Sequence, residues 1–408
     1  MDLSKPIVSK SKVNLELPPS CIQFCPAHPN YFVIGTYNLQ KDEADAPCDT
    51  DSEEKKPQSR NGTLLVYWTD GTELRHVQTL AQPSAILDLR FHPYQETEKG
   101  ILAVVSSTGT IAIFRLDPTR SEHTPLQHIT TSRCGDIDED TLFLQCNWHP
   151  TEKRLIGVTT STTLAKVLEL DESWAVRQTC DLDIHNSLEA WCIAFAPTAD
   201  QDTDKGADKG EDPVISIYCG GDDAMLRYSS WGWENDGDVL TGRPSFSPVC
   251  LKGKHDAGVT AILPLSTFDD NRDRLVITGS YDDQIRLFSI GDLHTSCGMR
   301  RVQLLAQEDM GGGVWRLDLI DVASSDLESK IRLLASCMHA GARVVEFRKT
   351  KDRDWTIQVL ARFEEHKSMN YGSDFMRRLG RDKVSSTLHC ISTSFYDKLL
   401  CLWDLEDV

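Results

Sequence analysis

One hairpin pattern recurs along this chain. Residues 278–288 read TGSYDDQIRLF, and weaker copies lie at 214–228, 333–347 and 388–404. Each copy has an alternating apolar run, a turn holding Gly, Asp or Tyr, and a second alternating run, which is typical of a half-buried β-hairpin. Fainter copies at 32–68, 101–116 and 155–170 make seven, and from the second copy onward they follow at intervals of 53 to 61 residues. A period of this size indicates a radial array rather than independent domains.

Further short strands flank the hairpins. One precedes the hairpin, as at 85–91, 142–148, 191–196, 259–265 and 314–320, and a fourth follows it at 301–306 and 356–363. Four strands in each of seven repeats predict an all-β, seven-bladed WD-repeat β-propeller that occupies residues 1–408 as one domain. The seventh repeat reaches Val408 after three strands, so we expect the alternating segment 6–15 to complete the last blade and remove the exposed sheet edge.

Composition narrows the class of protein. A net charge of −19 argues against nucleic-acid binding, and no apolar run approaches the ~18 residues that a membrane span requires. Thirteen cysteines without CxxC pairs indicate a reduced, cytoplasmic protein. Two acidic segments, 40–60 in the first hairpin and 198–212 in the fourth blade, are expected to be solvated insertions. We expect a monomer, because a closed ring has no need to self-associate.

Common catalytic motifs are absent. The chain has no GxSxG elbow, HExxH motif, phosphate-binding glycine loop or dinucleotide fingerprint, and no cofactor or metal is expected. Propellers of this kind commonly serve as interaction scaffolds. A non-catalytic scaffold for protein complexes, for example in membrane trafficking, is therefore the alternative that an enzymatic interpretation must overcome.

Unusual side chains gather at two kinds of position: the turns inside the hairpins and the segments that enter the innermost strands. In a propeller both open on one face, around the central channel. These positions differ between blades here, whereas purely structural turns tend to repeat. They bring together rings, carboxylates, one arginine and one histidine: Glu189, Trp191, Asp222, Tyr281, Asp282, Trp315, Arg316, His339, Tyr371, Asp374 and Tyr396.

The same segments carry a family resemblance. GTY at 35–37, SAILDL at 84–89, EAW at 189–191, GGDD at 220–223, GSYD at 279–282, GGVWR at 312–316, CMHAG at 337–341, YGSD at 371–374 and SFYD at 394–397 resemble the diphthine methyl ester hydrolases, also called diphthine methyltransferases. The resemblance implies a WD-repeat propeller of diphthamide biosynthesis. It also implies a carboxylic ester hydrolase that removes the methyl ester from the modified histidine of translation elongation factor 2, its protein substrate. The acidic insertions fall outside the match.

Ester hydrolysis requires a base, a nucleophile and donors for the developing oxyanion. We predict His339 as the base, since imidazole ordinarily titrates near ~6.5. Asp282 or Asp374 is predicted to orient it, although an Asp in a hairpin turn often only caps backbone N–H groups. Arg316 is predicted to stabilise the oxyanion or to bind a carboxylate bidentately, or else it lies across the strand tops.

The nucleophile is left open by sequence. A water activated by His339 ranks first, and Ser280, Ser394 or Cys337 as a covalent nucleophile ranks second. A metal-bound water ranks third, because one histidine among carboxylates is a thin ligand set.

The substrate implied by the resemblance carries a trimethylammonium group, which aromatic faces bind best. The available rings are Trp191, Tyr281, Trp315, Tyr371 and Tyr396. Glu189 or Asp222 would add negative charge. The alternative is that the rings only fill the channel by packing.

Two further histidines are interpreted as structural. His185 and His255 each precede an innermost strand, and we expect His255 to form a His–Ser–Asp network with Ser280 and Asp283 that fixes blade geometry.

Overall fold

The computed structural model describes residues 6–39, 59–94, 96–135, 137–138, 140–182, 188–197, 214–236, 239–244, 248–291, 301–325, 327–351, 353–376 and 387–406. The predicted insertion at 198–212 and all but residues 59 and 60 of the insertion at 40–60 lie outside these ranges, as does His185. Every named element in the described ranges is a β-strand.

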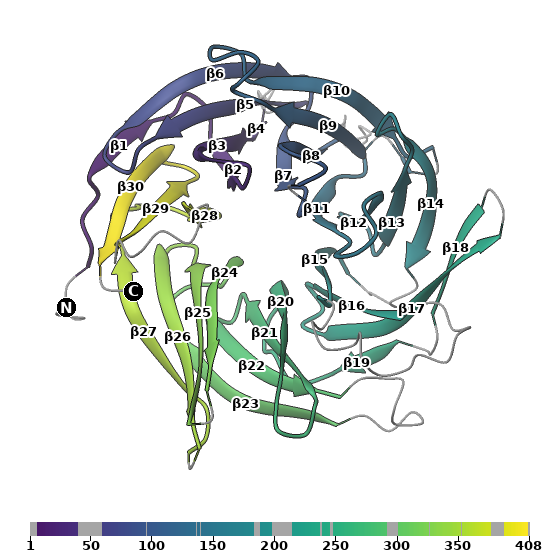
Figure 1. Cartoon of the computed structure of the whole chain (residues 1–408), viewed down its shortest axis with the longest axis vertical. Helices are drawn as coiled ribbons and strands as arrows, with labels where there is room; N and C mark the ends of the chain where they lie inside the picture. The colour runs from purple at the N-terminus through teal and green to yellow at the C-terminus, as the bar shows by residue number, and fades with distance from the viewer. Residues whose placement is uncertain are drawn as a thin grey trace, which may run out of the picture.

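Seven antiparallel sheets surround a central axis in chain order (Figure 1). The innermost strands are β2 (Pro19–Cys25), β7 (Ile86–Phe91), β11 (Phe143–Trp148), β15 (Ala190–Phe195), β20 (Val259–Phe268), β24 (Arg316–Ser324) and β28 (Gly372–Phe375). The second strands are β3 (His28–Thr36), β8 (Ile101–Ser106), β12 (Leu155–Thr160), β16 (Val214–Gly221), β21 (Arg274–Ser280), β25 (Glu328–Ser336) and β29 (Thr387–Ser394). The predicted seven-bladed propeller is therefore confirmed.

The outer half of each blade follows the same order. The third strands are β5 (Arg60–Thr69), β9 (Thr110–Leu116), β13 (Ala165–Leu170), β17 (Leu226–Asp236), β22 (Gln284–Ile290), β26 (Ala342–Thr350) and β30 (Leu399–Glu406). The outer strands are β6 (Leu74–Gln82), β10 (Leu126–Arg133), β14 (Val176–Leu182), β18 (Val239–Pro244) with β19 (Val249–Leu251), β23 (Val302–Asp309), β27 (Thr356–Phe363) and β1 (Ser11–Asn14). Blade 1 also contains the short β4 (Asn38–Leu39), which pairs with β5.

The ring closes as the alternation of the first residues predicts. Strand β1 pairs antiparallel with β30, with Val13 opposite Leu400. Strand β1 is thus the fourth strand of blade 7, and it covers the edge that β30 would otherwise expose.

The apolar core is divided among the interfaces between blades. Each cluster of buried side chains draws on adjacent blades, because every strand alternates between the two faces of its sheet. Phe363 of blade 6 and Trp403 of blade 7 illustrate this, since their rings stack with centroids 5.2 Å apart. Among the described elements there is no helix long and apolar enough to cross a membrane.

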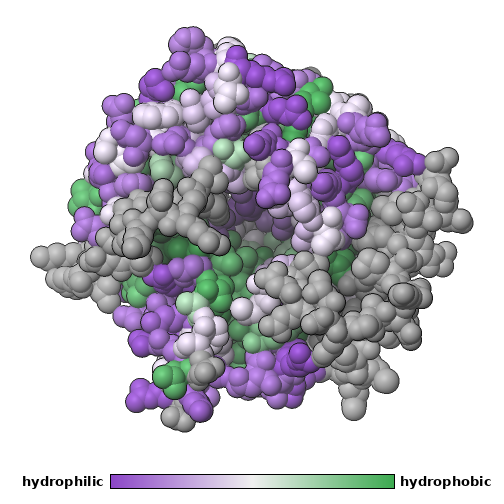
Figure 2. All heavy atoms as spheres, in the orientation of Figure 1, coloured by the Kyte–Doolittle hydropathy of each residue, from purple (hydrophilic) through white to green (hydrophobic). Residues whose placement is uncertain are grey.

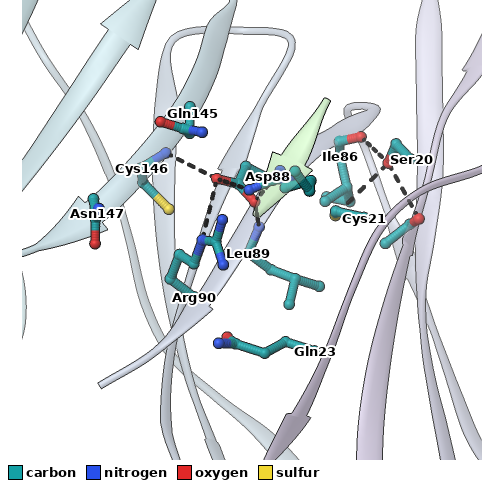
Figure 3. Close-up of polar contacts among 12 residues, drawn as sticks. Ser20, Cys21, Gln23, Ile86, Asp88, Leu89, Arg90, Gln145, Cys146 and Asn147 are labelled. Carbon is teal, nitrogen blue, oxygen red and sulfur yellow. Dashed lines mark hydrogen bonds and ion pairs between the residues drawn. The ribbon is translucent and has the colours of Figure 1, made fainter. Parts of the chain in front are cut away.

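The innermost strands are also joined by polar side chains. A side-chain oxygen of one innermost strand accepts a backbone N–H from an innermost strand of the neighbouring blade. Four such bonds are Phe91 N to Gln23 Oε1 (2.7 Å), Cys146 N to Asp88 Oδ2 (3.1 Å), Ile193 N to Gln145 Oε1 (2.8 Å) and Phe24 N to Asp374 Oδ2 (2.7 Å). Figure 3 shows Asp88 reaching toward Cys146 in this way. These bonds join blade to blade around the channel, in addition to the apolar contacts between blades.

Candidate active site at the channel mouth

The first residues of the innermost strands and the turns between second and third strands lie on one face, here called the channel mouth. Seven rings from this face form a continuous line of contacts, drawn from blades 4, 5, 6, 7 and 1. The centroid distances are Trp191–Tyr281 6.3 Å, Trp191–Trp315 5.4 Å, Tyr281–Trp315 5.9 Å, Trp315–Tyr371 5.0 Å, Tyr371–Phe395 5.6 Å, Phe395–Tyr396 5.0 Å and Tyr37–Phe395 6.2 Å. The strands that flank these rings surround the centre of the propeller in Figure 1, and a central hollow is visible in Figure 2.

Most of these rings keep an accessible surface. Trp191, Tyr281, Trp315 and Tyr371 are half-buried, and Tyr396 is 70% exposed. Rings that served only as packing would be buried, so the line can also offer π-faces to a bound group. The structure therefore brings together all five rings that the sequence nominated.

The line includes two rings that were not nominated, Phe395 and Tyr37. Phe395 contacts Tyr371, Tyr396 and Tyr37, and so joins the blade 7 rings to blade 1. Both lie inside segments that the sequence comparison singled out, GTY and SFYD. Their place in these segments was the sequence signal that could have nominated them.

A carboxylate lies at the blade 4 end of the line. The indole N–H of Trp191 donates to Asp222 Oδ1, and Asp222 is exposed in the turn between β16 and β17. Burial, and then the nearby charge of Asp222, raise the pKa of Tyr281, so its phenol keeps its proton. Gly258 permits this approach, because a Cβ there would lie 2.9 Å from Asp222 Oδ1 and 3.0 Å from the Tyr281 ring. Electron-rich rings beside an exposed carboxylate suit a cationic group.

Glu189 contributes differently. It is half-buried ahead of β15, and its backbone carbonyl accepts the N–H of Asp222 at 3.1 Å. Its backbone therefore lies next to both Trp191 and Asp222 at that end of the mouth.

His339 is exposed at the tip of the turn between β25 and β26. No hydrogen bond or ion pair joins it to another described residue. The turn itself is held firmly: Ala340 N donates to Cys337 O, and Asn370 N donates to Met338 O. Met338 has φ 41°, a strained value for a non-glycine residue. The fold thus presents a free imidazole on a rigid support.

The His339 turn adjoins the aromatic line. A Cβ on Gly313, two residues before Trp315, would lie 2.7 Å from Met338 Sδ and 3.4 Å from the Cα of Tyr281. Asn370, which bonds to Met338, directly precedes Tyr371. The turn is therefore packed against the two segments that lead into Trp315 and Tyr371.

The two carboxylates that were predicted to orient His339 have other partners. Asp282 binds Arg286 through both oxygens, at 3.0 and 2.8 Å, and accepts the N–H of Asp256. Burial by itself would raise the pKa of Asp282, but the hydrogen bonds, those from Arg286 foremost, outweigh it and lower the pKa. Asp374 is 1% exposed and accepts Phe24 N at 2.7 Å. Neither has a hydrogen bond to His339 in the described part of the chain, so the structure gives no support to either pairing.

Arg316 is likewise turned away from an oxyanion role. Its side chain is buried and binds Asp88 of blade 2, with Nη2 2.7 Å from Oδ1 and Nη1 3.4 Å from Oδ2. Burial opposes the charge of the guanidinium, yet Asp88 outweighs it and raises the pKa of Arg316. The position of Arg316 in sequence placed it at the strand top correctly, but its partner lies across the channel.

The candidate covalent nucleophiles are all buried. Ser280 Oγ donates to Ala257 O at 3.0 Å, and Ser394 Oγ binds the carboxylate of Asp397. Burial raises the pKa of the Cys337 thiol to about 12, which disfavours the reactive thiolate. None of the three presents a free nucleophile at the mouth, which favours water.

His255 is structural, although its partners differ from those predicted. Its Nε2 lies 2.8 Å from Thr278 Oγ1. The carboxylate that accepts the N–H of the next residue, Asp256, belongs to Asp282 and not to Asp283. Asp283 instead takes a left-handed conformation with φ 65°. His366 makes the equivalent bond to Ser392 in blade 7. These networks repeat between blades, as expected for structural groups.

Within the described residues no cluster of three or more His, Cys, Asp or Glu is arranged to hold a metal ion. No family model matches the chain. It is 26% identical to the diphthine methyltransferase of Saccharomyces cerevisiae, over 96% of each chain, and 26% identical to that of Schizosaccharomyces pombe, over 98% of each. The chain is a distant homologue of the diphthine methyltransferases. The human member shows 26% identity over 89% of this chain and 73% of its own length.

The homology runs through every blade, so it covers the whole mouth. Among solved structures, the chain resembles Saccharomyces cerevisiae Sqt1 with a TM-score of 0.56 over 98% of this chain and 100% of that one. At 12% identity this likeness concerns the fold alone.

Proposed function

We propose that this protein hydrolyses the methyl ester of methylated diphthine on translation elongation factor 2, yielding diphthine and methanol in a step of diphthamide biosynthesis. The observation that carries the proposal is the aromatic line with Asp222 at one end and the free imidazole of His339 beside it. Homology with diphthine methyltransferases over nearly the full chain supports the same step.

The quaternary ammonium of the substrate would bind on the aromatic line. A trimethylammonium group has no N–H to donate, so ring faces and nearby negative charge are its natural partners. Trp191, Tyr281 and Trp315 meet within 6.3 Å of one another, and Asp222 lies next to two of them. A neutral ester would not gain this attraction.

Catalysis would proceed through water. His339 accepts a proton from a water molecule as that oxygen bonds to the ester carbonyl carbon. The C–O bond to the methoxy group then breaks, and the methoxy oxygen takes the proton from the imidazolium to leave as methanol. The products are a carboxylic acid, which ionises, and neutral His339.

The phenols of Tyr281 and Tyr371 would stabilise the tetrahedral oxyanion in place of Arg316. Burial raises the pKa of both, so each keeps a proton to donate. Neither phenol oxygen has a hydrogen-bond partner among the described residues, and both rings contact Trp315.

No disulfide joins two of the described cysteines, which fits the reducing cytoplasm that we propose as the location of the protein. The decisive experiment incubates the purified protein with elongation factor 2 that carries methylated diphthine. Mass spectrometry of the modified peptide is expected to show replacement of the methyl group by hydrogen. Well-folded protein that leaves the ester intact would contradict the proposal and favour a non-catalytic scaffold.

A further inference from the structure

Four charged side chains meet inside the channel. Asp88 and Arg90 come from β7 of blade 2, and Arg316 and Asp318 come from β24 of blade 6. Asp88 binds Arg316 at 2.7 Å, and Arg90 Nη1 lies 4.0 Å from Asp318 Oδ1. Residues two apart on a strand share a face, so each strand directs both of its charges into the channel. The order of charges is reversed between the two strands, and this makes the pairs complementary.

These pairs cross the axis of the propeller. Strand β7 lies between β2 and β11, while β24 lies between β20 and β28, so blades 2 and 6 are not neighbours. Figure 1 shows β7 and β24 on opposite sides of the ring. The Asp88–Arg316 contact is therefore a strut between opposite walls, unlike the bonds that join adjacent blades.

The Asp88 end of the strut is fixed. The Asp88 side chain is 1% exposed and also accepts the N–H of Leu89 at 2.8 Å and of Cys146 at 3.1 Å (Figure 3). A buried carboxylate needs this many donors to offset its lost hydration. Blade 2, blade 3 and blade 6 thus meet at one carboxylate.

The other end of the strut is next to the centre of the aromatic line. Trp315 directly precedes Arg316, and its ring contacts Trp191, Tyr281 and Tyr371. A cavity of about 200 Å³ adjoins both Trp315 and Arg316. Trp315 is itself half-buried, so apolar packing does not enclose its indole completely.

We propose that the Asp88–Arg316 ion pair positions Trp315: by fixing residue 316 against the opposite wall, it holds the indole at the centre of the aromatic line. Arg316 and Asp88 are positioning residues, since neither touches the site of reaction. The expected effect of the ion pair on catalysis rests on the proposed function, whereas its expected effect on the position of the Trp315 ring does not.

The geometric test uses circular dichroism, because two indoles at 5.4 Å couple as an exciton pair. The measured quantity is the amplitude of the exciton couplet in the circular dichroism spectrum that is lost when Trp315 is replaced in Trp315→Phe. We expect Asp88→Asn and Arg316→Met each to remove at least half of it and to lower Tm. The double variant Asp88→Asn/Arg316→Met removes both charges and keeps a side-chain oxygen for the N–H groups of Leu89 and Cys146, so Tm should recover in part while the couplet stays reduced. Arg316→Lys, which keeps the charge, should retain part of it.

A matched pair provides the control. Asp321 also lies on β24, and it accepts a hydrogen bond from Arg332 Nε at 2.9 Å. Arg332 lies on β25, so this pair stays within blade 6. Asp321→Asn/Arg332→Met should leave the couplet unchanged. A wild-type couplet in Asp88→Asn and in the double variant would overturn the inference, as would a Trp315→Phe spectrum identical to that of the wild type.

The kinetic arm separates the two proposals. If the wild-type protein hydrolyses the ester, the double variant should show at least a fivefold higher KM for methylated diphthine, and a smaller change with a neutral methyl ester. Equal changes with both substrates would contradict positioning of the cation site. Absence of hydrolysis by the wild type would defeat the proposed function while leaving the spectroscopic result to stand.

Discussion

At the scale of single residues, His339 differs from the other described histidines in the propeller turns. His255 and His366 are buried and bonded to hydroxyl groups, whereas His339 is exposed without a partner on a strained turn. Strain that the surrounding bonds maintain is more common at functional sites than in ordinary turns. The contrast supports a chemical role for His339.

We expect His339→Gln to lower kcat for methylated diphthine by roughly 100-fold or more, because general base catalysis contributes about 10²- to 10⁴-fold. KM should change little, since the cation binds elsewhere. Steady-state kinetics on modified elongation factor 2 measures both. His123→Gln is the control, being an exposed histidine away from the mouth. Full activity in His339→Gln would remove this residue from the mechanism.

The aromatic line gives a second prediction. Trp191→Ala and Trp315→Ala should each weaken binding of the cationic substrate by about 0.5–2 kcal/mol, or roughly 2- to 30-fold in KM. Hydrolysis of a small neutral methyl ester should be affected much less. Trp68→Phe, at the outer part of blade 1, serves as a control for general effects of losing an indole. Equal losses with both esters would argue that the rings only pack.

At the scale of elements, buried histidines tie the turns to the strands beneath them. Burial, and to a lesser degree Arg286, lower the pKa of His255 to about 4, and burial lowers the pKa of His366 to about 4. An unfolded histidine ordinarily titrates near ~6.5. Between these values the unfolded chain binds protons that the folded protein does not, so stability falls as pH decreases.

Urea unfolding at pH 7.5 and pH 5 should therefore show a loss of about 2 kcal/mol for each of these histidines. This loss of stability is absent above pH ~6.5 and complete near pH ~4. His366→Gln should reduce the pH dependence by that amount, whereas His76→Gln, which changes an exposed histidine, should not. The same pH dependence in His366→Gln and the wild type would show that this histidine is not held neutral.

At the scale of the whole molecule, closure depends on a short strand far from its partner in sequence. Leu15 N donates to Lys398 O, so two residues earlier Val13 also lies at a hydrogen-bonded pair with Leu400. Proline at this position removes a donor from the ladder.

Val13→Pro should accordingly destabilise the protein by about 1–3 kcal/mol and promote association through the freed edge of β30. Calorimetry and size-exclusion chromatography measure these effects. Val8→Pro is the matched control, because Val8 is 70% exposed and precedes the strand. An unchanged Tm in Val13→Pro would show that β1 does not close the ring.

The strands were predictable because alternation of apolar residues is a local property. The innermost strand predicted at 85–91 is observed at Ile86–Phe91, and the closing segment 6–15 contains β1. The mouth was predictable for the same reason, since propeller geometry assigns turns and strand starts to one face. Hence Trp191, Tyr281 and Trp315 meet as expected.

Partners of charged residues followed another rule. Asp282 and Asp374 were paired with His339 on the basis of their turns, but Asp282 binds Arg286 and Asp374 binds Phe24 N of the next blade. Arg316 found Asp88, 228 positions away along the chain. A carboxylate pairs with whichever donor lies within about 3 Å in three dimensions, and alternation says nothing of that distance. The period of the repeats was therefore enough to predict the propeller and the residues at its channel mouth. Only the closed ring places β7 opposite β24, so only the tertiary structure decided that Arg316 binds Asp88 and that His339 has no partner among the described residues.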